Sequence, residues 1–149
     1  MQNRTADNLI DAFERIPVKI FPDLKDGSRF AASEIARLIR QKQDRKESCV
    51  LGLATGSTPK TLYAELVRMH REEGLSFRNV ISFNLDEYYP LEKEAWQSYH
   101  NYMHRLLFDH VDIDPKNIHI PNGELPKSEV KKHCGEYERL IEETGGIDL

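Results

Sequence analysis

Two short apolar runs constrain the fold of this chain more than any other feature of its sequence. Residues 49–54 read CVLGLA and residues 80–85 read VISFNL. Largely apolar runs of this length are typical of strands that are covered on both faces. Between them Leu62, Leu66 and Met69 recur at helical spacing, so a helix is expected to join the two strands. Because a strand, a helix and a second strand form the crossover unit of a parallel sheet, the chain is predicted to be an α/β protein with a largely parallel sheet and helices on both faces.

The remaining elements are predicted from apolar spacing and from turn residues. They are a short strand at 18–21, a helix starting at 26–28, a helix starting after Thr58 with Pro59 in its first position and stopping at Gly74, a helix at about 98–108, a short strand at 117–120, and an amphipathic helix at 128–143. Residues 147–149 look like the start of a further strand. Residues 18–149 are therefore interpreted as the N-terminal portion of a single domain that is incomplete at its C-terminus. Residues 1–17, which are polar and weakly patterned, are interpreted as an N-terminal extension.

Composition and charge exclude several classes of partner. The chain has 149 residues, enough for one domain with a core, and its net charge of −4 gives no reason to expect a nucleic-acid partner. No stretch approaches the ~20 apolar residues needed to cross a bilayer, and the first residues do not form a secretory signal. Cys49 and Cys134 are isolated and are interpreted as reduced thiols. We therefore expect a cytoplasmic protein without nucleic-acid or membrane partners.

The turn after the first apolar run is a candidate phosphate site. It reads Thr55-Gly56-Ser57-Thr58-Pro59. Glycine allows positive φ and close approach of a ligand, the three hydroxyls are hydrogen-bond donors, and the next helix presents unpaired N–H groups. The alternative is an ordinary capped turn, with Ser57 or Thr58 as the N-cap. The turn lacks the lysine and the length of a P-loop, so a nucleoside triphosphate is not expected.

The second apolar run ends in two adjacent acids, Asp86 and Glu87. Neighbouring side chains along an extended strand point to opposite faces, so the two carboxylates are not expected to share one proton. One of them could act in a cleft while the other orients a neighbouring group. The alternative for an acid at a strand end is a helix cap or a turn former. Ligands of open parallel sheets gather at the carboxyl ends of the strands, so this acid pair and the turn would face one crevice if their strands are neighbours.

Two histidines, His100 and His104, lie four residues apart in a predicted helix, a spacing that can hold a metal. Asn101 stands where the zinc-protease pattern requires glutamate, and no third ligand is evident, so surface or packing roles are preferred and no metal site is predicted.

Five aromatic residues surround the acids: Tyr88, Tyr89, Trp96, Tyr99 and Tyr102. They could line a pocket, or they could pack the loop against the sheet. The packing interpretation is preferred for most of them.

Three segments in this order and spacing resemble the glucosamine-6-phosphate deaminase family, also called glucosamine-6-phosphate isomerases. They are LGLATGSTP at 51–59, SFRNVISFNLDEYYPL at 76–91 and SYHNYMHRLLFDHVDIDPKNIHIPNG at 98–123. The resemblance runs from about residue 50 to residue 122 and continues more loosely to residue 149.

The resemblance implies a Rossmann-like fold and the conversion of glucosamine 6-phosphate and water to fructose 6-phosphate and ammonia, without an organic cofactor. It implies that the turn at 55–58 binds the substrate phosphate, and that Glu87 also belongs to the substrate site. It implies that Asp86 is the catalytic base, which removes the C2 proton of the opened sugar and returns it at C1. A proton beside the C1 carbonyl is acidic enough for a carboxylate within hydrogen-bond reach to move it. A homo-oligomer is expected for the full-length protein.

The chain also departs from the family pattern. The family's ring-opening histidine and its supporting acids lie on a loop after the next strand, which falls beyond Leu149, so the 149-residue fragment alone is expected to be inactive. A 6-phosphogluconolactonase is an alternative, but those enzymes typically carry arginine after the Asp-Glu pair, where this chain has Tyr88. A non-catalytic sugar-phosphate-sensing domain is a second alternative, and it would need the turn but not Asp86.

Overall fold

The structure, a computed structural model, describes residues 18–149, and the predicted extension at 1–17 lies outside them. Strands and helices alternate as predicted. The elements are α2 (Leu24–Asp44), β1 (Cys49–Leu53), α3 (Lys60–Glu73), β2 (Val80–Asn84), α4 (Tyr99–Leu106), η1 (Phe108–His110), η2 (Pro115–Asn117), β3 (Ile118–His119) and α5 (Lys127–Glu143). The boundaries of the helices follow local chemistry: the Asp23 side chain caps α2, and α3 ends at Gly74 as predicted, with this residue in the left-handed conformation (φ +67°).

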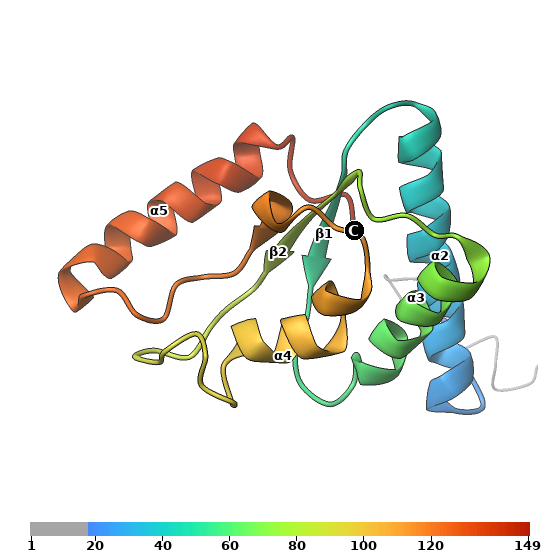
Figure 1. The fold of residues 1–149 in the computed structure, drawn as a ribbon, viewed down its shortest axis with the longest axis horizontal. Helices are drawn as coiled ribbons and strands as arrows, with labels where there is room; N and C mark the ends of the chain where they lie inside the picture. Colours follow the sequence, from blue (N-terminus) through green and yellow to red (C-terminus); the bar gives the residue numbers. More distant parts are fainter. Residues whose placement is uncertain (1–17) are drawn as a thin grey trace, which may run out of the picture.

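The described sheet is parallel throughout, with strand order β1-β2-β3. β1 and β2 are direct neighbours, and Leu53 lies opposite Asn84 where both strands end. The carboxyl ends of the strands point toward the bottom of Figure 1, where the turn after β1, the loop after β2 and α4 gather. The predicted parallel α/β architecture is therefore confirmed, and so is the neighbourhood of the two strands that carry the candidate site.

Helices cover both faces of the sheet, as predicted, but they do so unequally. The core lies on the face covered by α2, α3 and α4, and it includes Cys49, Leu51, Leu53, Ile39, Leu66 and Met103. On the other face, Tyr137 of α5 packs edge-on against Phe83 of β2, with ring centroids 5.6 Å apart. No residue of α5 is fully buried, and Figure 1 shows this helix reaching away from the sheet on the side opposite α2 and α3. The second face of the sheet is thus the more open one.

Several predicted strands need correction, and β1 and β3 are each slightly shorter than predicted. Residues 18–21 form no strand because their backbone has no partner in the described part of the sheet, and Phe21 packs on Phe30 of α2 instead. β2 ends at Asn84, since its partner β1 ends opposite at Leu53, and this leaves Leu85 89% exposed. Residues 147–149 are not assigned as a strand.

The backbone of residues 147–149 nevertheless lies beside β1. The Asp148 N–H donates to the Val50 carbonyl (2.9 Å), and the Gly52 N–H donates to the Leu149 carbonyl (2.8 Å). The Asp148 carboxylate also accepts from the Val50 N–H and pairs with Lys42 of α2 at 2.8 Å. These contacts place the segment along the free edge of β1, where the sequence predicted another strand to begin.

Candidate substrate site

The turn between β1 and α3 is held rigidly by its neighbours. Three side chains donate hydrogen bonds to its carbonyl oxygens: Asn84 Nδ2 to Leu53 (2.8 Å), the Tyr63 hydroxyl to Ala54, and the Tyr102 hydroxyl to Gly56 (2.6 Å). Burial raises the pKa of both tyrosines, so the two hydroxyls stay protonated. Because C=O and N–H point in opposite directions in a trans peptide, fixing these carbonyls also fixes the N–H groups that follow them. The turn therefore presents backbone donors in a fixed arrangement.

The start of α3 has the features of an anion site. Pro59 occupies the N-cap position, and no side chain caps the helix. The interpretation of Ser57 or Thr58 as a capping residue is therefore wrong, and both side chains are exposed. Gly56 has a φ of +97°, a conformation that glycine adopts without strain. The first N–H groups of the helix thus remain available to a negatively charged ligand.

Two basic side chains complete this end of the site, and neither was predicted from the sequence. Lys60, the first residue of α3, and Arg105 of α4 line a cleft of about 690 Å³ together with Gly56 and Ser57. Both side chains are exposed, and neither forms an ion pair with any residue in the described range 18–149. The spacing of Tyr99, Tyr102 and Arg105 could have revealed Arg105, because residues three apart share one face of a helix.

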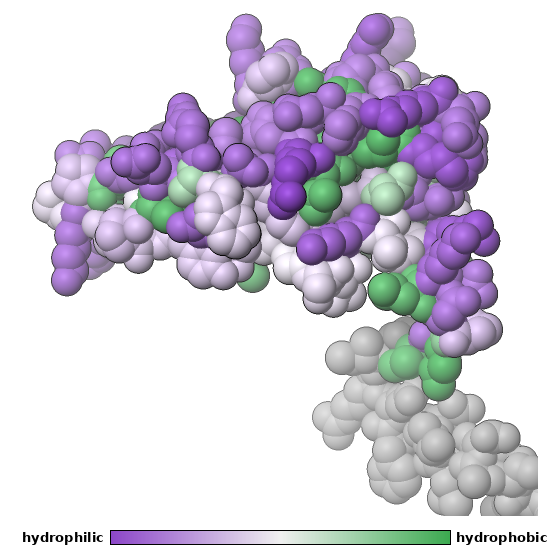
Figure 2. All heavy atoms as spheres, turned by 60° about the horizontal axis from the view of Figure 1, so that its bottom comes forward, coloured by the Kyte–Doolittle hydropathy of each residue, from purple (hydrophilic) through white to green (hydrophobic). Residues whose placement is uncertain are grey.

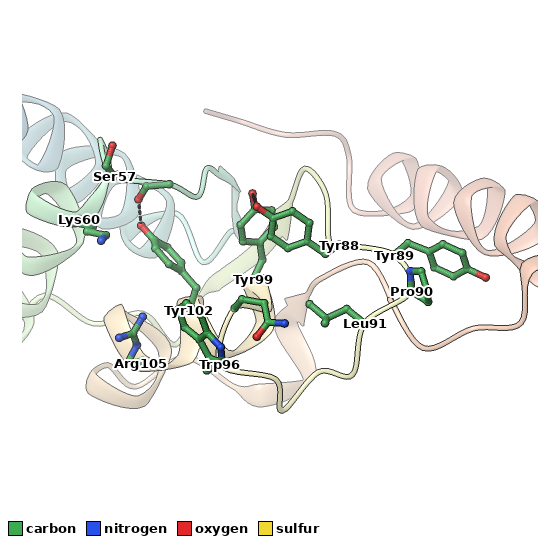
Figure 3. Close-up of a pocket in the computed structure, with 12 residues that line it drawn as sticks. Ser57, Lys60, Tyr88, Tyr89, Pro90, Leu91, Trp96, Tyr99, Tyr102 and Arg105 are labelled. Atoms are coloured by element: carbon green, nitrogen blue, oxygen red, sulfur yellow. Dashed lines mark hydrogen bonds between the residues drawn. The ribbon is translucent and has the colours of Figure 1, made fainter.

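The five aromatic residues line this same cleft, so the preferred interpretation that most of them pack the loop against the sheet is wrong. Tyr88 and Tyr99 lie against each other with ring centroids 4.8 Å apart, and the Tyr99 hydroxyl donates to that of Tyr88 (3.3 Å). Figure 3 shows the resulting arrangement: Ser57, Lys60 and Arg105 lie at one end, Tyr89 and Pro90 at the other, and Tyr102, Trp96, Tyr99 and Tyr88 between them. The cleft has a basic end and an aromatic end.

Asp86 follows the end of β2 by two residues and points elsewhere. It lines a second pocket of about 280 Å³, with Gly123 and residues of α5 such as His133 and Tyr137. Its carboxylate is exposed and accepts no hydrogen bond from the described residues. The prediction of one shared crevice is therefore wrong in part: the turn and Asp86 leave neighbouring strand ends but line two adjoining pockets. Among residues 18–149, only Tyr89 lines both. A two-residue excursion past the end of β2 carries Asp86 toward the α5 side.

Glu87 has a structural role, because its carboxylate binds the start of α4. Its carboxylate accepts backbone N–H groups from Tyr88 (2.8 Å), Tyr99 (2.8 Å) and His100 (2.9 Å). Tyr99 and His100 open α4, so the negative charge sits at the positive end of that helix. Glu87 and Asp86 therefore do different things, and Glu87 orients its neighbour as one of the sequence alternatives proposed.

Gly123 fixes the loop that carries these acids, and its replacement gives a direct test. A Cβ at this position would lie 2.5 Å from the Tyr88 carbonyl and 2.8 Å from the Leu91 carbonyl. Gly123→Ala is expected to destabilise the fold by about 1–3 kcal/mol, because the backbone of the loop has to shift. The free energy of unfolding in urea measures this. Gly135→Ala on α5, where a Cβ meets nothing within 4 Å, is the control and should be stabilising by about 1 kcal/mol. Equal stabilities for the two variants would contradict the close approach.

Other candidate chemistry in the described residues is sparse. The rings of His100 and His104 lie tilted against each other with centroids 4.5 Å apart, and within 18–149 no group of three or more His, Cys, Asp or Glu side chains could hold a metal ion. Cys49 and Cys134 are free thiols, and burial raises the pKa of Cys49 to about 11. None of the helices described between residues 18 and 149 is long and apolar enough to cross a membrane.

These features define a class: an α/β protein with a parallel sheet and a small-ligand cleft, basic at one end, beside the carboxyl ends of its strands. The sequence model of the family described as glucosamine-6-phosphate isomerases/6-phosphogluconolactonase matches residues 22–149. The chain therefore belongs to this family, and its fold is Rossmann-like.

Individual relatives agree with this assignment. A glucosamine-6-phosphate deaminase-like protein of Bacteroides thetaiotaomicron is 45% identical over 99% of this chain and 22% of its own length. A glucosamine-6-phosphate deaminase of Porphyromonas gingivalis is 49% identical over 87% of this chain and 49% of its own. The solved structure of a monomeric glucosamine-6-phosphate deaminase superposes with a TM-score of 0.83 at 38% identity, covering 89% of this chain and 53% of that one. A 6-phosphogluconolactonase of Thermotoga maritima gives a TM-score of 0.63 at 25% identity, over 78% and 50% of the two chains. The chain thus spans about half the length, or less, of these relatives.

Proposed function

We propose that this chain is the N-terminal part of a glucosamine-6-phosphate deaminase, which converts glucosamine 6-phosphate and water to fructose 6-phosphate and ammonia. The observation that carries the proposal is the pairing of β1 with β2, because it sets a rigid anion-binding turn beside an unengaged carboxylate at neighbouring strand ends. Relatives at 45–49% identity are named as deaminases or deaminase-like, which supports the same reaction. We further propose that the protein is cytoplasmic.

The turn and the two basic residues are assigned to the substrate phosphate. Backbone N–H groups at the start of α3 and the hydroxyls of Thr55, Ser57 and Thr58 would donate to the phosphate oxygens, and Lys60 and Arg105 would balance their charge. A phosphate held away from the reacting carbons orients the sugar without taking part in the chemistry. We assign Glu87 to the same site through its hold on the first turn of α4, which carries Tyr102 and Arg105.

Asp86 is assigned the proton transfer. In the open-chain sugar the C1 aldehyde makes the C2 proton acidic. The Asp86 carboxylate takes this proton, and the electron pair of the C–H bond forms the C1=C2 bond of an enolamine. The π electrons of the C1 carbonyl move to O1, which takes a proton from water. Return of the same proton to C1 leaves a C2 iminium, which water hydrolyses to the ketone and ammonia. A base for this step must be unengaged and within hydrogen-bond reach of the proton, and the exposed Asp86 carboxylate meets the first condition.

The family resemblance places the ring-opening histidine beyond Leu149, so we expect the 149-residue chain alone to be inactive. Fructose 6-phosphate formed from glucosamine 6-phosphate, measured in a coupled assay, tests this, with the full-length protein as the positive control. Turnover by the 149-residue chain at more than a thousandth of the full-length rate, a limit set from the roughly 10²–10⁴-fold worth of a general acid–base group, would contradict the expectation. Hydrolysis of 6-phosphogluconolactone by the full-length protein, without deamination, would favour the lactonase alternative.

Assembly of the full-length protein is a separate proposal. The family resemblance suggests a homo-oligomer, whereas the solved deaminase with a TM-score of 0.83 is described as monomeric. The turn, the basic pair and Asp86 all come from one chain.

A further inference from the structure

The cleft that begins at the phosphate turn extends well past it. Its volume of about 690 Å³ lies within the range of pockets that hold drug-sized ligands, which are larger than a monosaccharide phosphate. The basic residues and the turn occupy one end, and the remaining lining is mostly aromatic, as Figure 3 shows. Asp86 is not part of this lining. The cleft adjoins the pocket that Asp86 lines, because Tyr89 lines both.

The aromatic end exposes rings that folding usually buries. Trp96 is 82% exposed, and Tyr88 and Tyr89 are 53% and 45% exposed. Tyr99 backs this group, with its ring tilted against that of Tyr88. Figure 2 turns the carboxyl edge of the sheet forward, and residues of intermediate hydropathy, drawn nearly white, lie there among hydrophilic ones. Clustered exposed aromatic surface that lines a groove marks a binding site, whereas single exposed apolar residues do not.

We propose that this cleft binds a phosphate ester that carries a second ring, with the phosphate at the turn and the ring stacked on Trp96 and its tyrosine neighbours. Exposed tryptophan and tyrosine faces stack on nucleobases, and the apolar face of a sugar ring offers the same flat surface. The ligand is thus a nucleoside phosphate or a disaccharide phosphate. The proposal rests on the proposed function in one respect, namely that the turn binds phosphate. Because both ligands need the same turn, the ring-bearing ester competes with the substrate.

Isothermal titration of the full-length protein with four probes tests this proposal. The probes are inorganic phosphate, glucosamine 6-phosphate, uridine 5′-monophosphate and maltose 6′-phosphate. At least one of the last two is expected to bind about tenfold more tightly than inorganic phosphate and to displace glucosamine 6-phosphate. The arm that shows the gain identifies the ring as a nucleobase or a sugar.

The variants assign the gain to the aromatic end. Trp96→Ala should remove this gain and weaken the affinity for the ring-bearing ester about tenfold, while the affinity for glucosamine 6-phosphate stays unchanged. Trp96→Phe, which keeps a flat ring, should retain most of the gain in affinity. Two outcomes overturn the aromatic subsite alone. In the first, phosphate and glucosamine 6-phosphate bind, but neither ring-bearing ester binds more tightly than phosphate. In the second, an ester does bind more tightly, but Trp96→Ala leaves that gain in affinity intact. Failure of all four probes to bind overturns the phosphate turn as well, and with it the proposed function.

Discussion

Asp86→Asn in the full-length protein is expected to lower the turnover of glucosamine 6-phosphate about a hundredfold to ten-thousandfold, while substrate affinity changes little. Asparagine has the shape of aspartate but cannot accept the C2 proton. The carboxylate accepts no hydrogen bond from the described residues and is exposed, so its replacement breaks no contact that holds the fold. The effect should therefore appear in kcat and not in the free energy of unfolding.

Following the transferred hydrogen separates a chemical role from a structural one. With glucosamine 6-phosphate deuterated at C2, the wild-type protein in ordinary water should carry deuterium to C1 of the product, and Asp86→Asn should lose this transfer in parallel with turnover, as followed by NMR. Asp44→Asn is the matched control, because Asp44 is an exposed acid at the end of α2. This variant should retain both the turnover and the transfer of the label. Turnover by Asp86→Asn within about threefold of wild type would remove Asp86 from the mechanism, because a lost general base costs far more.

The framework of this fold could be read from the sequence because local chemistry and global packing agree in it. The run at 49–54 is apolar since every residue of β1 except Gly52 is buried, and Pro59 and Gly74 bracket α3 through their own backbone preferences. The strand predicted at 18–21 fails for the opposite reason: its residues have strand-like composition, but strand pairing needs a partner that no local pattern can supply. The same limit explains why β2 stops at Asn84, opposite the last residue of β1.

The candidate site was predictable only where a single segment carries it. The turn at 55–58 and Asp86 each sit at the end of a predicted strand, so their place at the carboxyl edge follows from the sequence. Lys60 and Arg105 line one cleft only because α3 and α4 converge on that edge, and these two helices are far apart in the sequence. The division into two pockets depends on the path of a few residues after Asn84, which residue patterns do not determine.

The basic pair provides the second large effect. Lys60→Gln and Arg105→Gln are each expected to weaken the affinity of the full-length protein for glucosamine 6-phosphate about tenfold to a hundredfold, because a charge-assisted hydrogen bond to phosphate contributes about 1.5–3 kcal/mol. Both side chains are exposed and unpaired within the described residues, so neither change should destabilise the fold. Rates at saturating substrate should change little, since the phosphate is held equally in the ground state and the transition state.

Comparison of ligands and salt concentrations shows whether the loss is electrostatic. The variants should lose affinity for inorganic phosphate in the same proportion as for glucosamine 6-phosphate. For the double variant Lys60→Gln/Arg105→Gln, the difference in affinity from wild type should shrink as ionic strength rises, because salt screens exposed charges. Lys131→Gln, an exposed lysine on α5 outside the cleft, is the matched control and should bind as the wild type does. If the double variant binds both ligands within about twofold of wild type, a difference of less than about 0.5 kcal/mol, the phosphate is not held at this end of the cleft. In that case the turn would need its cations from a part of the protein beyond residue 149, and the aromatic cleft would have no anionic ligand to anchor.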